Sequence, residues 1–144
     1  MYTASINNSM ADPRLLGDMA EQKFILMCMS KGIGIYRPVN SNSRVDFIIE
    51  LHGLKRVQIK YRSMLHGKLS LSAIKQQNGR DKVLKYDAQE IDLFLVYEPS
   101  TDQFYNVPLS MYADNTVNIF RIHKPKNGQC KGVKYLHDYI FNWS

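Results

Sequence analysis

The sequence predicts a single α/β domain over residues 1–144, with a mixed β-sheet flanked by helices. Apolar residues recur at helical spacing near both ends of the chain. Between these ends, short segments rich in β-branched and aromatic residues alternate apolar with polar positions, and polar turns separate them. A chain of 144 residues with 44% hydrophobic content is large enough to build one independent core.

The first helix is expected to run from about Pro13 to Lys31. Asp12 is a good N-cap, a proline suits the first turn, and Gly32 or Gly34 can end the helix. Glu21 lies at the edge of its apolar stripe, where a carboxylate is a candidate for a buried, charge-compensated role. The stripe consists of Leu16, Met19, Ala20, Phe24, Met27 and Cys28.

Two strands joined as a hairpin are predicted over Val45–Leu51 and Leu54–Arg62. Asp46 shares a face with Gln58 and Lys60 only if the loop between the strands has an odd number of residues. A three-residue turn, His52-Gly53-Leu54, with a positive φ at Gly53, meets this condition, and a bulge is the alternative.

The rest of the chain predicts further strands and a second helix. Val133–Trp143 carries aromatic residues at helix-like intervals, so this segment is expected to be a helix. Its aromatics suit either core packing or an interface between subunits, and both uses remain open. The additional strands are expected at Ile33–Pro38, Lys68–Ser72, Ile91–Tyr97, Gln103–Val107 and Thr116–Ile122.

The residues of the predicted hairpin suit a Mg²⁺ site that hydrolyses phosphodiesters, because Mg²⁺ prefers oxygen ligands and can neutralise charge at phosphorus. Asp46 is the expected principal carboxylate, and the Ile59 carbonyl a backbone ligand. The Gln58 amide could ligate the metal or orient a bound water. Lys60 could position the attacking water and stabilise charge near the phosphate. Glu21 could reach the metal directly or through water.

Each of these residues also has a purely structural interpretation. Asp46 could be a turn residue, Glu21 could form a salt bridge at the helix edge, and a Gln-x-Lys strand can arise by chance. Asp46 and Lys60 could also form only a structural pair. The ordered set on a basic chain favours the nuclease interpretation over these alternatives.

Glu21 on a first helix, Asp46 on a strand and Gln58-x-Lys60 on the next strand resemble the PD-(D/E)XK nuclease superfamily. In length and motif order the chain is most similar to the intron-encoded homing endonuclease branch. The resemblance covers about Pro13 to Arg62 by motif and extends to the later hairpin expected over Ile91–Val107. Val45 stands where proline is usual. Gln58 stands where most members of the superfamily have an acid, and some homing endonucleases also carry glutamine there. The lost negative charge implies weaker metal binding.

This resemblance implies a restriction-endonuclease-like core and Mg²⁺-dependent cleavage of double-stranded DNA at a long, specific, nearly symmetric site, with Mn²⁺ able to substitute. A single centre cuts one strand, so the resemblance implies a homo-oligomer, a dimer or a tetramer. A Holliday-junction resolvase or a restriction endonuclease with the same core is the alternative enzyme. A non-catalytic DNA-binding module is the alternative of a different class.

Charge supports a nucleic-acid partner, because the net charge is +6 and the sequence pI is near 9.3. The amides and guanidinium of Gln76–Arg80 suit base edges, although a solvated polar loop fits equally well. The expected DNA-binding residues are Arg44, Arg62, Lys68, Lys75, Gln76, Gln77, Arg80, Lys82 and Lys85. A second basic cluster, expected to contact phosphates, comprises Arg121, His123, Lys124, Lys126, Lys131 and Lys134.

Several other classes of protein are disfavoured. Cys28 and Cys130 are too few for a disulfide framework, and no histidine has zinc-ligand spacing with them. No glycine-rich phosphate loop is present, so we expect no nucleotide cofactor. The sequence shows no signal-peptide core and no membrane-spanning segment, so we expect no membrane partner and a cytoplasmic location.

Overall fold

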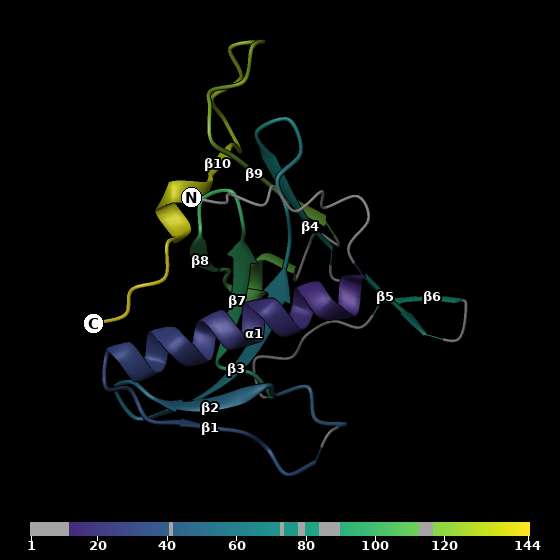
Figure 1. Cartoon of the computed structure of the whole chain (residues 1–144). Coiled ribbons are helices and arrows are strands. Elements are labelled where there is room, and N and C mark those ends of the chain that lie inside the picture. Colours follow the sequence, from purple (N-terminus) through teal and green to yellow (C-terminus); the bar gives the residue numbers. More distant parts are fainter. Residues whose placement is uncertain (1–11, 41, 73, 78–79, 84–89, 113–116) are drawn as a thin grey trace.

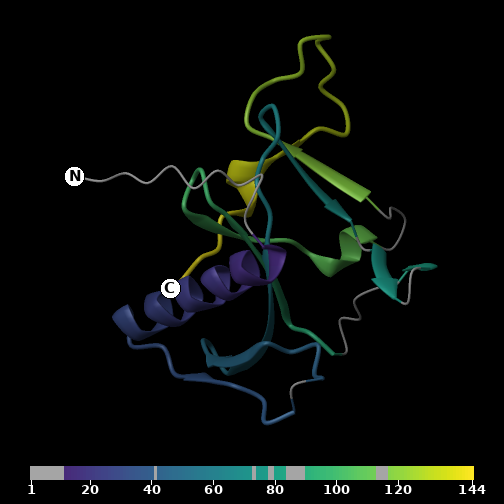
Figure 2. The same cartoon turned by 45° about the vertical axis from the view of Figure 1, so that its right-hand side comes forward.

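The computed structural model describes residues 12–40, 42–72, 74–77, 80–83, 90–112 and 117–144, and side chains within these ranges except at 74–83 and 112. One long α-helix lies across one face of a five-stranded sheet (Figure 1). A three-stranded sheet packs against part of the other face of the five-stranded sheet. A separate two-stranded hairpin projects from the body of the molecule, as the turned view in Figure 2 also shows.

Helix α1 spans Pro13–Ser30. The five-stranded sheet has the order β1 (Ile35–Tyr36), β2 (Phe47–Glu50), β3 (Leu54–Tyr61), β7 (Leu93–Glu98) and β8 (Gln103–Asn106). The three-stranded sheet has the order β10 (Lys134–Tyr135), β9 (Val117–Arg121) and β4 (Lys68–Ser72). The hairpin pairs β5 (Ile74–Gln77) with β6 (Arg80–Val83), and two 3₁₀ helices are η1 (Leu109–Tyr112) and η2 (Leu136–Tyr139).

The five-stranded sheet is mixed, because β3 pairs parallel to β7 while its other pairings are antiparallel. This confirms the predicted α/β class. Only one α-helix is present among the described residues, so the second helix expected to flank the sheet is missing.

Two hydrophobic clusters cover the two faces of the five-stranded sheet, because successive side chains of a strand point to opposite faces. On one face, α1 packs its buried residues against alternate residues of β2, β3, β7 and β8. On the other face, β4, β9 and η2 pack against the intervening residues of β7 and β8. The first cluster centres on Ala20, Phe24, Phe47, Ile49, Val57, Ile59, Leu95 and Phe104, and the second on Leu69, Leu71, Phe94, Val96, Tyr105 and Phe120.

The predicted bounds of helix α1 are correct at Pro13 and one residue too long at the C-terminus, because the helix ends at Ser30 rather than Lys31. The Asp12 carboxylate accepts a hydrogen bond from the Arg14 N–H at 2.9 Å, as an N-cap should. Beyond the last turn, Gly32 adopts a φ of 70°, which glycine tolerates best. Ala20, Phe24 and Cys28, spaced four residues apart, are fully buried along one stripe.

The loop between β2 and β3 has three residues, so the prediction of an odd loop length is correct. It consists of Leu51, His52 and Gly53, one residue earlier than expected. Gly53 has the predicted positive φ, at 93°, and His52 shares this conformation at 51°. The resulting register pairs even-numbered residues with even-numbered ones, as in Glu50 opposite Leu54.

The prediction of a C-terminal helix over Val133–Trp143 is wrong. The segment instead forms β10, η2 and an extended tail that is bound to the edge of β8, where the Phe141 N–H donates to the Phe104 carbonyl at 2.8 Å. Leu136 is buried in the second cluster and Phe141 in the first. An extended tail can place side chains in both hydrophobic clusters, whereas one short helix has a single apolar stripe and can pack against only one of them.

The described residues of the segment Gln76–Arg80 belong to a β-hairpin, rather than to the solvated polar loop that was one interpretation of the sequence. Residues on either side pair as β5 and β6, with Gln77 opposite Arg80 and Ile74 opposite Val83. The intervening Asn78-Gly79 dipeptide lies outside the described residues. Asn-Gly between two short runs is a recognised hairpin signal, and it was present in the sequence.

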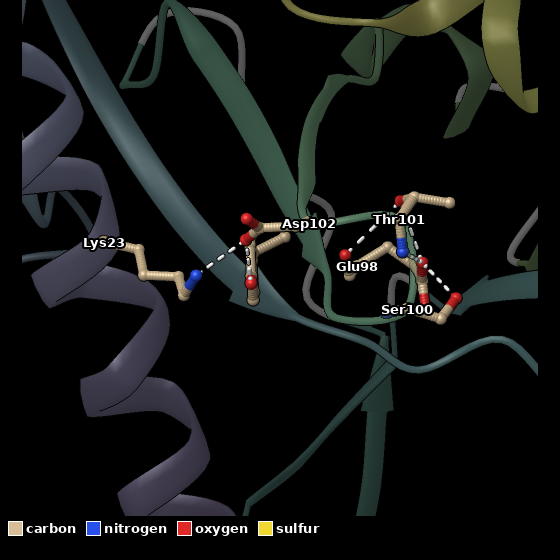
Figure 3. A network of polar contacts seen from close by, with 6 residues as sticks. Lys23, Glu98, Ser100, Thr101 and Asp102 are labelled. Atoms are coloured by element: carbon tan, nitrogen blue, oxygen red, sulfur yellow. Dashed lines mark hydrogen bonds and ion pairs between the residues drawn. The ribbon is translucent and has the colours of Figure 1, made fainter. Parts of the chain in front are cut away.

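A polar network fastens the β7–β8 turn to the body of the protein (Figure 3). The fully buried Glu98 carboxylate accepts hydrogen bonds from the backbone N–H and hydroxyl groups of Ser100 and Thr101. Burial alone would raise the pKa of Glu98, but these donors outweigh it and lower the pKa. Next to it, Asp102 accepts from Lys23 of α1 at 2.7 Å, which ties the turn to the helix.

No helix among the described residues is both long and apolar enough to cross a membrane.

Phe24→Ala should lower the free energy of unfolding by about 3–5 kcal/mol, because it empties the centre of the first cluster. The Phe24 ring lies 5.6 Å from the rings of Phe47, Phe104 and Trp143. Leu26→Ala on the same helix is the matched control, since Leu26 is 66% exposed, and it should change stability by less than about 0.5 kcal/mol. Urea denaturation measures both, and equal losses would contradict this assignment of the core.

Candidate active site

The candidate site forms where β2 stops and β3 continues. Phe47, paired with Val57, is the first residue of β2, so β3 extends beyond its neighbour. The Ile59 N–H, which would otherwise lack a strand partner on that side, donates to the Asp46 carboxylate at 2.7 Å. The Asp46 N–H in turn donates to the Val57 carbonyl at 2.8 Å. Asp46 is therefore held at the edge of β3 through both its backbone and its side chain.

This arrangement also determines where the Ile59 carbonyl points. In an antiparallel ladder the N–H and C=O groups of one residue point toward the same neighbouring strand. The Ile59 carbonyl therefore lies on the same edge of β3 as the amide that Asp46 accepts from. A carboxylate and a backbone carbonyl, both good oxygen ligands for a hard cation, lie on one strand edge.

Glu21 reaches this site from α1, halfway along the helix. Burial raises the pKa of the Glu21 carboxyl above its usual range, and the nearby Asp46 carboxylate raises it further. Arg37 lowers it, with its guanidinium 3.9 Å from the Glu21 carboxylate and 5.0 Å from the Phe47 ring centroid. Two carboxylates from different elements thus lie close enough to repel each other.

Gln58 and Lys60 flank Ile59 on β3. Val57 and Ile59 are buried under α1, so Gln58 and Lys60 project from the opposite face of the sheet. Both side chains are half-buried. The Gln58 Oε1 atom is buried and accepts no hydrogen bond from any described group. A buried acceptor without a donor is costly unless something else satisfies it.

These donors fit a divalent cation. Burial is the main cause of the raised pKa of Glu21, and a cation between Glu21 and Asp46 would relieve the repulsion that adds to it. The Ile59 carbonyl is a neutral ligand of the type that Mg²⁺ accepts, and so is the Gln58 oxygen, which approaches the strand edge from the face opposite α1. Within the described part of the chain, no group of three or more His, Cys, Asp or Glu residues could hold a metal ion. A site of this composition therefore depends on the glutamine and the backbone.

The predicted DNA-binding residues are spread over several elements. Arg44, two residues before Asp46, is half-buried and paired with Glu90 at 3.2 Å. Arg62 is exposed just after β3, and Lys68 begins β4. Five of the predicted residues belong to the strands of the β5–β6 hairpin: Lys75, Gln76, Gln77, Arg80 and Lys82. Lys85 lies outside the described residues.

Sequence reasoning missed Arg37 and Arg56. Arg37 belongs to a loop 16 positions after Glu21 and has no local pattern that connects it to the helix. Arg56 forms two side-chain hydrogen bonds with Asp92, at 3.0 and 3.1 Å, and pairs β3 with the segment before β7. Both contacts join segments that are distant in sequence, so only the fold reveals them.

A helix over a mixed sheet, with carboxylates where one strand ends beside the next, is the arrangement expected of the restriction-endonuclease-like fold. The chain belongs to the PD-(D/E)XK endonuclease family, because the model of that family matches residues 11–142. Nucleases of this family generally use divalent metal ions.

The fold is also similar to a solved structure, that of a bacterial homing endonuclease, I-Ssp6803I. The TM-score is 0.68, the sequence identity is 20%, and the match covers 90% of this chain and 89% of that one. A comparison with curated protein sequences gives no match.

Glu21→Gln should stabilise the metal-free protein at neutral pH by about 0.5 kcal/mol, the size of a partly screened like-charge pair. A carboxyl whose pKa is raised by folding adds stability below its unfolded pKa, about 4.3, and that stability is lost as the pH rises through the folded pKa. The free energy of unfolding of the variant should therefore exceed that of the wild type at pH about 8 and equal it at pH about 3.5. Urea denaturation in EDTA measures this, and a difference independent of pH would contradict it.

Proposed function

We propose that this protein is a Mg²⁺-dependent, sequence-specific endonuclease of the homing type that hydrolyses phosphodiester bonds in double-stranded DNA. Glu21, Asp46, Gln58 and Lys60 are its proposed catalytic residues. The observation that supports the proposal is that the Asp46 carboxylate accepts a hydrogen bond from the Ile59 amide at the strand edge and raises the pKa of Glu21. On the same strand, the buried Gln58 oxygen has no donor among the described residues.

The proposed metal ligands are Asp46, the Ile59 carbonyl, Gln58 and Glu21, the last directly or through water. When bound, Mg²⁺ supplies charge neutralisation at the phosphate and lowers the pKa of a water nucleophile, and Mn²⁺ can substitute for it. The Ile59 amide holds the Asp46 carboxylate in one orientation. Arg37 counters part of the negative charge of Glu21 before a cation arrives. The proposed role of Lys60 is to stabilise charge that develops on the phosphate.

The homing type is favoured over a resolvase or a restriction enzyme by two observations. Gln58 stands at the position where the resemblance to the homing branch accommodates glutamine. The fold matches that of a bacterial homing endonuclease over nearly its full length. Cleavage of both strands needs two centres across the two-fold axis of DNA, so a homo-oligomer, a dimer or a tetramer, follows from the proposal.

Lys60→Ala should lower the rate of DNA cleavage by at least about 10²-fold while binding of the same duplex persists, because the ammonium acts on the scissile phosphate. Asp46→Asn should have the same effect by weakening the metal site. A nicking assay with and without Mg²⁺ measures cleavage, and a gel shift in Ca²⁺ measures binding.

Lys55→Ala is the matched control, because Lys55 lies on the same strand, opposite Ile49 and away from the candidate site, and should leave cleavage intact. Metal-independent binding without cleavage by the wild type would instead identify a DNA-binding module. Preference for four-way junctions over any linear duplex would identify a resolvase.

Gln58→Glu should lower the Mg²⁺ concentration for half-maximal cleavage by about tenfold, equivalent to about 1.4 kcal/mol, because it adds a charged oxygen ligand. Gln58→Ala should raise that concentration, since it removes the oxygen altogether. A Mg²⁺ titration of cleavage rate compares the three proteins. If all three respond to Mg²⁺ alike, Gln58 does not face the metal.

A further inference from the structure

A basic cavity of about 520 Å³ lies at the end of the β4–β9 pair, away from the candidate active site residues. It forms between the Leu65–Lys68 turn and the loop that follows β9. Cationic and imidazole side chains line it, and none of the described residues in its lining is a carboxylate. The residues used here are His66, Lys68, Arg121, His123, Lys124 and Lys126.

The walls of this cavity are held by backbone contacts. Leu65 and Lys68 exchange backbone hydrogen bonds at 2.9 and 3.0 Å, with His66 and Gly67 both at positive φ between them. The Ile122 N–H donates to the Gly67 carbonyl at 3.2 Å, which joins the turn to the second wall. Pro125 is buried at the base of its loop. The cationic side chains therefore project from a fixed frame.

The charges around the cavity lack the compensation seen elsewhere. Four other basic residues are paired with acids, in the pairs Lys23–Asp102, Arg37–Glu21, Arg44–Glu90 and Arg56–Asp92. By contrast, no ion pair between described residues includes the four cations of the cavity, Lys68, Arg121, Lys124 and Lys126. Register even sets two of them side by side, since Lys68 pairs with Arg121. Like charges gathered around a concave surface focus a positive potential that attracts an anion.

We propose that this cavity is a phosphate-binding site that holds the backbone of the DNA substrate, independently of base sequence and apart from the centre that cleaves it. The proposal rests on the proposed nuclease function for the identity of the anion. Lysine and arginine side chains bind phosphodiesters through charge, and imidazole N–H groups can add hydrogen bonds.

The position of the cavity gives it a role different from that of the β5–β6 hairpin. Strand β4 begins at Lys68, in the cavity, and ends at Ser72, two residues before β5 begins. Five residues of strand span about 17 Å, roughly half a turn of B-DNA. Figures 1 and 2 both show the loop after β9 and the β5–β6 hairpin at opposite ends of the β4–β9 pair. A duplex along this pair can meet the cavity with its backbone and the hairpin with a groove.

The test compares Lys126→Gln, in the cavity, with Lys131→Gln, which removes the same charge from the same loop outside the cavity lining. Binding of a cognate and an unrelated duplex is measured by fluorescence anisotropy over a range of salt concentrations in EDTA. Lys126→Gln should reduce the slope of log affinity against log salt by about 0.9, the value for one lost phosphate contact, on both duplexes. Lys126→Arg should restore the slope, and Lys131→Gln should change it less.

Equal effects of the two glutamine variants would overturn the proposal in favour of a diffuse basic surface. A loss confined to the cognate duplex would also overturn it, because base reading would then be involved. Inorganic phosphate at matched ionic strength is the second probe. If it protects Lys124 and Lys126 from acylation as well as the duplex does, the cavity is a site for free phosphate rather than DNA. Nuclease activity of the wild type is scored separately, so a failure of the proposed function stays distinguishable.

Discussion

The hydrogen bond from the Ile59 amide to the Asp46 carboxylate is the interaction on which the candidate site depends. It exists because β2 ends while β3 continues, leaving an amide at the strand edge that needs an acceptor. A hydrogen bond to a charged group contributes about 1.5–3 kcal/mol, more than a neutral one. The requirement to satisfy this amide therefore fixes a carboxylate beside the Ile59 carbonyl. Helix α1 packs against the same sheet and brings Glu21 near enough to that carboxylate for it to raise the pKa of Glu21 further.

The site is arranged at a cost to the metal-free protein. Two carboxylates repel each other, and a buried amide oxygen of Gln58 has no donor within the described part of the chain. Local conflicts of this type are expected where function, rather than stability, selects the residues. Outside the site, the Asn118 Oδ1 atom is also buried without a donor among the described residues, whereas other buried polar groups are paired. Glu98 is fully buried, but its carboxylate accepts hydrogen bonds from the residues of the turn around it. The aromatic cluster around Phe24 holds α1 against the sheet.

Sequence was a good guide where the pattern was local. The cap at Asp12, the odd loop before Leu54 and the strand Lys68–Ser72 follow from spacing and turn chemistry over a few residues. It failed at the C-terminus, where Tyr139 and Trp143 matched a helical period but the chain is divided between two clusters and the edge of β8. Arg37 was invisible for a similar reason, because its contact with Glu21 depends on how the loop after β1 folds back toward α1. The motif indicated which residues carry chemistry, whereas their convergence at one strand edge needed the fold.

The account can be tested most directly by anomalous diffraction from crystals soaked in Mn²⁺, which reports the cation position without relying on activity. The central claim is that Asp46, Glu21, Gln58 and the Ile59 carbonyl surround one divalent ion. It predicts an anomalous peak about 2.0–2.3 Å from an Asp46 carboxylate oxygen and within ligand or water-bridged distance of the others. A peak elsewhere on the protein, with none beside Asp46 at saturating Mn²⁺, would contradict it.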